Sequence, residues 1–356
     1  MAHRLSLTRR AAELRRLYTA ETDSTLLPTI ANALNRFSPD HRAMLHEILD
    51  RGYETRLFGE NTVPAVDHRF RDALLPDTTD ILQQQLEAGI LYALGQVAPY
   101  QWPDTDVVAP MPLCRMARPV PGSEQTILHL PLGALARMMA VLTPRVVDCR
   151  PYGLAGLRAT LQRRHVQLHL ADGGPTRLVG LAKVSARQWA ASLAFVQQVH
   201  GFAQPPVLDG RLTGPERDVI RAGRVPGPVA LACGVFRRLR ILGDTFWLTV
   251  DTDGPDGLRL GWSGGRSAVQ VATALVHPVT GLAGDRFYVT RVAEGAVTII
   301  VTGIAGEPTA KLALHQVPLT ATPPFTPVDV SAAWDEFRRV MKTTSLSACG
   351  LELVSR

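Results

Sequence analysis

A short run of glycines around one serine is the most specific chemical pattern in this chain of 356 residues. Residues 261–265 are Gly-Trp-Ser-Gly-Gly and match the pattern G-x-S-x-G, between a predicted strand and a predicted helix. A serine on such a turn can act as a nucleophile, and the amide that follows it can help to bind an oxyanion. Asp285 and His315 come after Ser263 in an order that suits an acid and a base.

The turn at Ser263 resembles the nucleophile turn of the α/β-hydrolases, and His200-Gly201 lies upstream where such enzymes often carry a His-Gly turn. Three features favour a different interpretation. The strand before Ser263 is predicted to pair in a local hairpin, His200 ends a predicted helix, and only 93 residues follow Ser263. We expect the glycines to form a strand-to-helix turn, and a serine hydrolase with Ser263 as its nucleophile is kept as an alternative.

Two further groups of residues could hold a metal ion. Asp251, Asp253 and Asp256 could offer carboxylates to Ca²⁺, but no bidentate acid closes the loop, and Asp-Gly pairs are typical of hairpin turns. His165 and His169 share one face of a predicted strand with no carboxylate or thiol nearby, which is typical of a half-buried face. The four cysteines are scattered, without a C-x-x-C pair. The sequence therefore indicates no metal site and no cofactor.

Arginine dominates the positive charge of the chain. The net charge is +6, and all but three of the 38 basic residues are Arg. Clustered arginines supply phosphate contacts in nucleic-acid-binding proteins, although an Arg- and Ala-rich composition is also typical of a GC-rich coding sequence. Two predicted helices carry candidates for binding DNA or RNA: Arg9, Arg10, Arg15 and Arg16 on the first, and Arg237, Arg238 and Arg240 on the second. The second helix could be the recognition helix of a winged-helix unit over residues 213–262.

One stretch of the chain appears twice, 82 residues apart. Nine identities link residues 154–195 with residues 236–277: Leu157, Arg158, Arg177, Leu178, Ser185, Ala186, Gln188, Ala190 and Leu193 recur as Leu239, Arg240, Arg259, Leu260, Ser267, Ala268, Gln270, Ala272 and Leu275. Each copy is predicted to be a helix, a hairpin and a second helix, with the first helix at residues 152–164 in copy one. Such a unit cannot bury its apolar face alone, so we expect two copies packed as a pair.

The remaining pattern predicts an α+β fold in which an N-terminal all-α domain is followed by an α+β domain. Residues 1–98 are predicted to form the helical domain. Six prolines make residues 99–125 a stiff connector, because a proline has no amide donor. The α+β domain is expected over residues 126–316 and contains the duplicated helix-hairpin-helix unit. A Pro-rich linker at residues 317–330 leads to a C-terminal helix and tail at residues 331–356.

Composition points to an ordinary globular protein, with 46% hydrophobic and 20% charged residues. Apolar runs are too short to cross a membrane, and the N-terminus lacks the apolar region of a secretory signal, so we expect a soluble cytoplasmic protein without a membrane partner. The favoured interpretation is a non-enzymatic binding or adaptor subunit that contacts another protein or associates with itself. The alternatives are DNA or RNA binding through the arginines, and the serine hydrolase.

Overall fold

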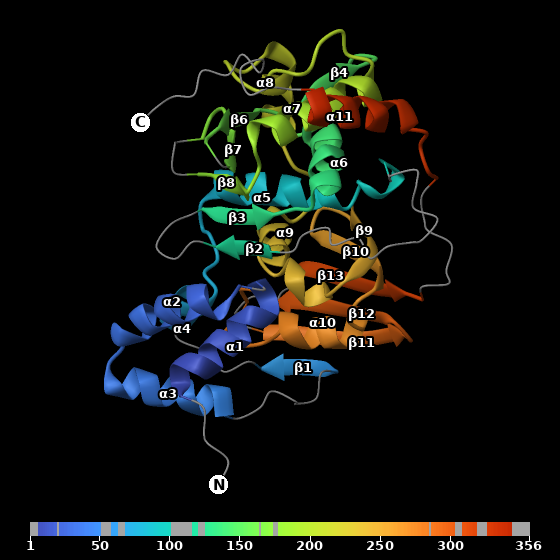
Figure 1. Ribbon diagram of the computed structural model, residues 1–356. Coiled ribbons are helices and arrows are strands. Elements are labelled where there is room, and N and C mark those ends of the chain that lie inside the picture. The colour runs from blue at the N-terminus through green and yellow to red at the C-terminus, as the bar shows by residue number, and fades with distance from the viewer. Residues whose placement is uncertain are drawn as a thin grey trace.

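A group of short helices forms the N-terminal part of the protein. The computed structural model describes residues 6–19, 21–50, 58–62, 68–100, 116–119, 125–163, 165–173, 177–284, 286–302, 308–318 and 326–343. The N-terminal helices are α1 (Leu7–Thr19), α2 (Asp23–Asn35), α3 (Pro39–Asp50) and α4 (His68–Leu74), and they lie together at one end of the molecule (Figure 1). Leu26, Ile30, Leu45 and Phe70 form a small core there, which Val279 completes from the distant second half of the chain.

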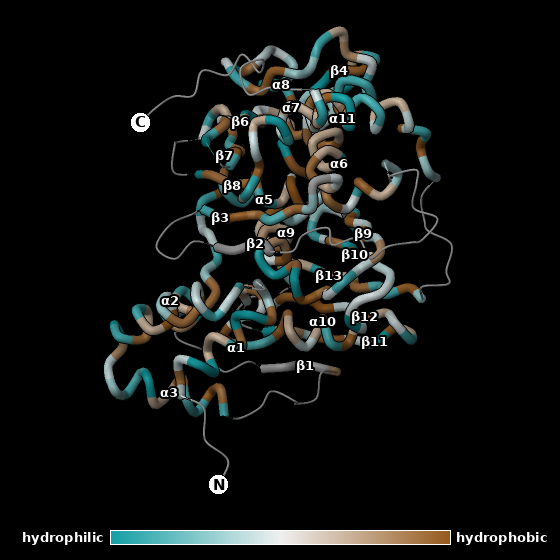
Figure 2. Tube along the Cα trace, in the orientation of Figure 1, coloured by the Kyte–Doolittle hydropathy of each residue, from teal (hydrophilic) through white to brown (hydrophobic). Residues whose placement is uncertain are grey.

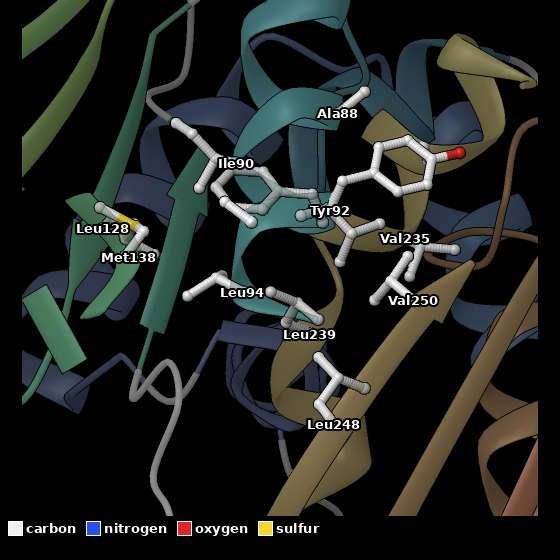
Figure 3. Close-up of a cluster of buried hydrophobic side chains, with 14 of the residues drawn as sticks. Ala88, Ile90, Tyr92, Leu94, Leu128, Met138, Val235, Leu239, Leu248 and Val250 are labelled. Atoms are coloured by element: carbon white, nitrogen blue, oxygen red, sulfur yellow. The ribbon is translucent and has the colours of Figure 1, made fainter. Parts of the chain in front are cut away.

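The central helix is α5 (Ile81–Leu94). Asp80 caps it by accepting hydrogen bonds from the amides of Leu82 and Gln83, and all residues from Leu86 to Leu94 are buried. A helix that is buried on every side belongs in the middle of a core. It packs against α9 (Val229–Phe236), α6 (Leu132–Leu142) and β9 (Thr245–Thr252). Side chains of α5 and α9 meet there, as Tyr92 and Val235 do in Figure 3.

Two mixed sheets hold most of the strands. The larger sheet has the order β1-β11-β12-β13-β10-β9, in which β10 and β13 run parallel and the other neighbours antiparallel. Its remaining strands are β1 (Gly59–Thr62), β10 (Gly257–Gly264), β11 (Arg286–Ala293), β12 (Ala296–Thr302) and β13 (Pro308–Val317). The smaller sheet has the order β2-β3-β8-β7-β6, and its parallel pair is β3 with β8. Its strands are β2 (Met116–Pro119), β3 (Thr126–His129), β6 (Leu157–Leu161), β7 (His165–Leu170) and β8 (Val179–Ala182).

Helices and one small hairpin complete the fold. α7 (Ala186–His200) packs against both α6 and α11 (Ser331–Thr343), where Trp334 and Phe195 have ring centroids 4.3 Å apart. α10 (Ala268–Leu275) packs on β12 and β13. The other elements are the hairpin of β4 (Arg145–Val147) and β5 (Arg150–Tyr152), α8 (Gly214–Ala222), and the 3₁₀ turns η1 (Ala98–Tyr100) and η2 (Leu239–Leu242).

One large cluster of buried side chains runs through the molecule, from Tyr18 in α1 to Phe337 in α11. Apolar residues are concentrated along α5, α6, α9 and α10 (Figure 2). Helices and sheets together confirm the expected α+β class, whereas the domain boundaries remain a prediction. Within the parts of the chain that the structure describes, no helix is long and apolar enough to span a membrane.

The predicted repeat holds only in part. In both copies a hairpin leads to a helix with a capping box, formed by Ser185 with Gln188 and by Ser267 with Gln270. The helix predicted at residues 152–164 is wrong, because strand β6 occupies that place, whereas α9 and η2 precede the second hairpin. Gly153 and Gly156 have φ of 78° and 80°, which breaks a helix, and β7 supplies a partner for the strand. The shared unit is therefore a hairpin and a capped helix.

The N-terminal region is also not purely helical. Within the predicted helical domain, residues 59–62 form β1 and pair with β11, from Gly59 opposite Val289 to Thr62 opposite Arg286. The sequence Gly-Glu-Asn-Thr has no strand preference of its own, and the pairing is set by the distant partner strand. A second strand, β2, lies inside the predicted Pro-rich connector, at the edge of the smaller sheet, where a proline costs no central hydrogen bond.

Candidate functional site

Ser263 lies inside the larger sheet. It pairs with Trp247 of β9 and with Val317 of β13, and only 2% of it is exposed. The register of β10 shifts directly after it, and Gly264 and Gly265 have φ of 77° and 62°. These glycines form the turn that leads to α10, so the serine belongs to the strand and is not presented to solvent by the turn.

The proposed partners of Ser263 are not brought to it. His315 is exposed on β13, opposite Gly261, and makes no hydrogen bond to Ser263. Asp285 lies outside the described residues. A nucleophilic serine needs a base at about 2.6 to 3.2 Å, a contact that Ser263 does not make with any described histidine. The geometry gives the hydrolase alternative no support.

Most arginines of α1 are engaged with carboxylates. Three ion pairs form there: Arg10 with Asp50, Arg15 with Glu21 and Arg16 with Asp23. Arg15 is fully buried, and its Nη1 also donates to the carbonyl of Leu74 at 2.9 Å. Arg9 is exposed. This helix therefore does not present its four arginines as one basic face.

Two of the three arginines expected on a recognition helix are also internal. Arg237 and Arg238 are 1% and 0% exposed, and the less buried Arg240 pairs with Asp244 at 2.9 Å. Arg237 donates through Nε and Nη2 to both oxygens of Glu87, each at 2.7 Å. Arg237 and Arg238 thus face the interior, where a phosphate backbone cannot reach them.

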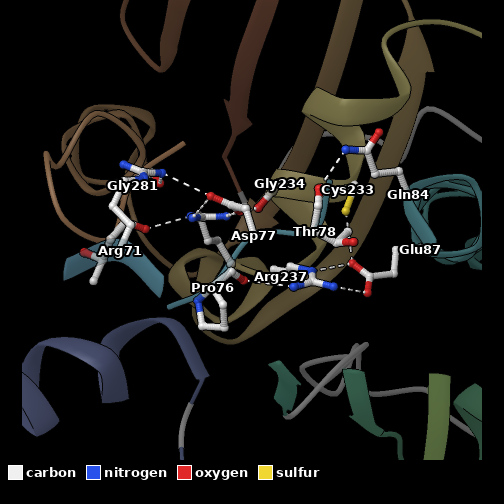
Figure 4. A network of polar contacts seen from close by, with 12 residues as sticks. Arg71, Pro76, Asp77, Thr78, Gln84, Glu87, Cys233, Gly234, Arg237 and Gly281 are labelled. Atoms are coloured by element: carbon white, nitrogen blue, oxygen red, sulfur yellow. Dashed lines mark hydrogen bonds and ion pairs between the residues drawn. The ribbon is translucent and has the colours of Figure 1, made fainter. Parts of the chain in front are cut away.

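Glu87 is the centre of this buried network, shown in Figure 4. It is 0% exposed and accepts hydrogen bonds from four residues: Arg237, Gln83 at 2.7 Å, Thr126 at 2.6 Å and the thiol of Cys233 at 3.1 Å. Burial lowers the pKa of Arg237, but the adjacent Glu87 carboxylate outweighs it and raises that pKa overall. The Arg237 guanidinium therefore stays charged, and its contact with Glu87 joins α5 to the end of α9.

Asp77 makes a second bridge a few residues before α5. Its carboxylate accepts from Arg238 at 2.6 and 3.0 Å and from Arg71 at 3.1 Å. Burial raises the pKa of Asp77, but the two guanidinium groups outweigh burial and lower it overall. Arg71 also donates to the carbonyls of Pro278 and Gly281, so α4, α9 and the turn after α10 are tied together.

Cys233 borders a cavity of about 380 Å³ beside this network. Burial, followed by the charge of Glu87, raises the pKa of the Cys233 thiol well above its usual value, so the thiol stays protonated and is a poor nucleophile. Asp77, also in the cavity lining, is held by its two arginines. Cys233 and Asp77, the polar groups of this lining described above, therefore stabilise the fold.

The two metal candidates have ordinary structural roles. Asp253 pairs with Arg259 at 3.2 Å and with Lys311 at 2.9 Å, at the turn between β9 and β10. His165 and His169 are half-buried on one face of β7, and burial lowers the pKa of His169. Over the described ranges, no three His, Cys, Asp or Glu side chains gather closely enough to hold an ion.

A cavity that the sequence did not predict lies where the β4–β5 hairpin meets α8, at the top of Figure 1. We call it the hairpin cavity. Its volume is about 290 Å³, and its walls are the hairpin, residues 206–211 and the start of α8. The hairpin turns at Asp148 and Cys149 with φ of 50° and 61°, as a two-residue turn requires. No sequence motif marks this site, because its walls come from three separate segments.

Apolar side chains stand exposed around the hairpin cavity. Val207 is 76% exposed, Val146 53% and Tyr152 46%, and all three line the cavity. The guanidinium of Arg145 lies over the Tyr152 ring at 5.4 Å, which fixes the ring against the hairpin. Val147 is a third exposed apolar side chain on the hairpin itself, beside Val146 and Tyr152.

A buried ion pair holds the walls of the cavity in place. Arg158 donates to both oxygens of Glu216 at 2.9 and 3.0 Å, and to the carbonyls of Gly210 and Arg211. Burial raises the pKa of Glu216, but the hydrogen bonds from Arg158, Thr213 and Gly156 outweigh it and lower the pKa to about 2. The loop and α8 are thus fixed against each other.

Three charged side chains line the cavity besides the Arg158–Glu216 pair: Arg145, Asp209 and Arg211. Arg145 is half-buried, whereas Asp209 and Arg211 are exposed, and neither of these two exposed side chains forms a hydrogen bond or ion pair with any described residue. The hairpin cavity therefore combines exposed apolar side chains with charges of both signs.

Comparison of the chain with protein-family models, with curated proteins and with solved structures gives no match.

Proposed function

We propose that the protein is a non-enzymatic binding or adaptor subunit that acts through protein contacts at the hairpin cavity. The observation that carries the proposal is the gathering of Val146, Tyr152 and Val207, each about half or more exposed, around one preformed recess. Exposed apolar side chains that gather in one patch mark interaction sites, whereas exposed apolar residues that are scattered singly are normal on a protein surface. A tyrosine and arginines in the lining are also typical of protein interfaces.

Rigidity of the recess supports the proposal. The bidentate pair of Arg158 with Glu216 positions the loop and α8, and the hydrogen bonds to Gly210 and Arg211 fix the wall that carries Val207. A wall that is ordered in advance loses little conformational entropy when a partner binds. The chemistry of the site favours an apolar anchor in the recess, with polar groups around it.

The test is affinity capture with three tagged forms of the protein: wild type, Val207→Asp and Val292→Asp. Each tagged form is co-expressed with an untagged copy of the protein. Val292 is 72% exposed on the β11–β12 hairpin and serves as the matched control. We expect quantitative mass spectrometry to find proteins that wild type and Val292→Asp retain and Val207→Asp loses. Equal thermal stability of the three forms must accompany this result. Identical captured sets for all three would refute the proposal.

A further inference from the structure

Arg145, in the lining of the hairpin cavity, is a half-buried arginine without a carboxylate partner among the described residues. Its Nη1 donates to the carbonyls of Ala140 and Thr143, at 3.3 and 3.2 Å, where α6 ends. Its Nε and Nη2 donate to no described residue. Because a guanidinium carries N–H donors on all three nitrogens, part of its fork stays available to a ligand.

Other arginines of this protein show what burial of the charge usually requires. Five buried arginines each pair with a carboxylate: Arg15 with Glu21, Arg158 with Glu216, Arg224 with Asp172, Arg237 with Glu87 and Arg238 with Asp77. At Arg145 burial lowers the pKa of the guanidinium, and no carboxylate opposes that effect. The carbonyls at the end of α6 offset only part of the charge. An anion in the cavity would supply the rest.

The charge of the lining favours an anion with a single negative charge. Arg158 and Glu216 neutralise each other, so Arg145, Arg211 and Asp209 set the balance. Two positive charges and one negative charge leave a net charge of +1. A carboxylate complements that charge, and its two oxygens match the planar fork of a guanidinium.

Apolar groups lie close to the Arg145 guanidinium. Its Cζ atom is 5.4 Å from the centroid of the exposed Tyr152 ring, and the exposed Val146 is the next residue. The volume of about 290 Å³ is at the lower end of the range for ligand sites, about 300 to 1,000 Å³. The cavity therefore suits a short ligand that carries a carboxylate and an apolar group close together.

We infer that the hairpin cavity binds the C-terminal residue of a partner protein, with its apolar side chain against Tyr152 and its α-carboxylate at Arg145. A chain terminus carries both groups on one Cα atom, whereas an internal acidic residue holds its carboxylate apart from the apolar side chain of its neighbour. Capture of a terminal carboxylate is a recurring mode of peptide recognition. This inference rests on the proposed function and names the part of the partner that binds.

Fluorescence anisotropy with short fluorescein-labelled peptide pools is the test. The pools are random except for the last residue, which is Leu or Ser, and each is made with a free C-terminal carboxylate or with a C-terminal amide. We expect wild type to bind the Leu free-acid pool saturably. The Leu amide pool and the Ser free-acid pool should each bind about tenfold or more weakly, since each lacks one of the two recognised groups.

Three variants test the assigned charges. Arg145→Met should weaken binding of the Leu free-acid pool by about tenfold to a hundredfold and abolish the preference for acid over amide. Arg221→Met is the matched control, because Arg221 is exposed on α8 and lies outside the cavity lining. Asp209→Asn removes the opposing charge at the rim and should strengthen binding by about two- to fivefold. Equal thermal stability of all forms must accompany these results.

Four results would overturn the inference: no saturable binding of the Leu free-acid pool, equal binding of acid and amide by wild type, an acid preference that Arg145→Met retains, or weaker binding in Asp209→Asn. N-acetylleucine that binds as tightly as the pool would also overturn it, because the ligand would then be a free acid and not a protein terminus. The proposed function is judged separately: Val207-dependent capture of a protein would leave it standing even if the terminal carboxylate plays no part.

Discussion

Removing the charge of Glu87 is expected to be among the most destabilising single changes in this protein. Glu87→Gln keeps the shape of the side chain but leaves the Arg237 guanidinium, 1% exposed, without its counter-charge. Breaking a buried ion pair by removing one partner costs about 3 to 5 kcal/mol. The amide group of the new glutamine also turns donors toward the donors of Arg237. The loss is a large part of the 5 to 15 kcal/mol that typically stabilises a folded protein.

The assay is urea unfolding followed by circular dichroism, with the free energy of unfolding extrapolated to water. Asp218→Asn is the control, because Asp218 pairs with Arg221 while both side chains are more than 70% exposed. Exposed pairs contribute about 0 to 1 kcal/mol. The double variant Glu87→Gln/Arg237→Met removes both charges, so it should cost less than the sum of the two single changes. Equal, small losses of unfolding free energy in Glu87→Gln and Asp218→Asn would show that the buried pair does not stabilise the fold.

Further predictions concern titration, thiol access and packing. Burial, followed by the charge of Arg71, lowers the pKa of His277 to about 4, so the folded protein binds fewer protons than the unfolded chain between about pH 6.5 and pH 4. Stability should fall as the pH drops through that window, and His277→Asn should flatten the fall in urea midpoints. Glu216, with its pKa of about 2, should add a second loss between about pH 4.5 and pH 2, which Arg158→Met should diminish. Iodoacetamide should label the exposed Cys149 in the folded protein and Cys233 only after unfolding, as peptide mass spectrometry can show; early labelling of Cys233 would contradict its burial. Ala272→Phe should overpack the inner face of α10 and lower the free energy of unfolding by about 1 to 3 kcal/mol, whereas an unchanged urea midpoint would mean that the face has room.

Local signals in the sequence predicted the β7–β8 and β9–β10 hairpins and the helix that follows each of them. The pairs Ser185 with Gln188 and Ser267 with Gln270 are three residues apart, and each forms a capping box. The turn between β9 and β10 falls in the Asp- and Gly-rich segment where it was expected. These features depend on contacts within a few residues, which a sequence displays directly.

Features that depend on distant partners were missed. Residues 157–161 are rich in Leu, Ala and Arg and favour a helix, but β7 provides a ladder that makes them a strand. The arginines that follow α9 appeared to be a basic face, because Glu87 lies 150 residues before Arg237, and Asp77 lies 161 before Arg238. No pattern of residue types in the sequence predicts ion pairs between residues so far apart.

The hairpin cavity could not be predicted from the sequence either, because its walls come from segments that are far apart along the chain. Val146, Tyr152 and Val207 are unremarkable apolar residues until the fold places them around one recess. A sequence distinguishes an exposed valine from a buried one only where apolar and polar residues alternate regularly along an element. The three-residue strands of the hairpin are too short to show such an alternation.

The distance along the chain between Glu87 and Arg237 also has a consequence for protein synthesis. A ribosome adds about 5 to 20 residues per second, so roughly 8 to 30 s separate the appearance of the two residues. During that interval the apolar α5 and its carboxylate have neither α9 nor the guanidinium to cover them. The nascent chain therefore lacks the α9 cover of this buried central helix until two thirds of the protein has been made, and we expect α5 to be the segment most in need of a chaperone during synthesis.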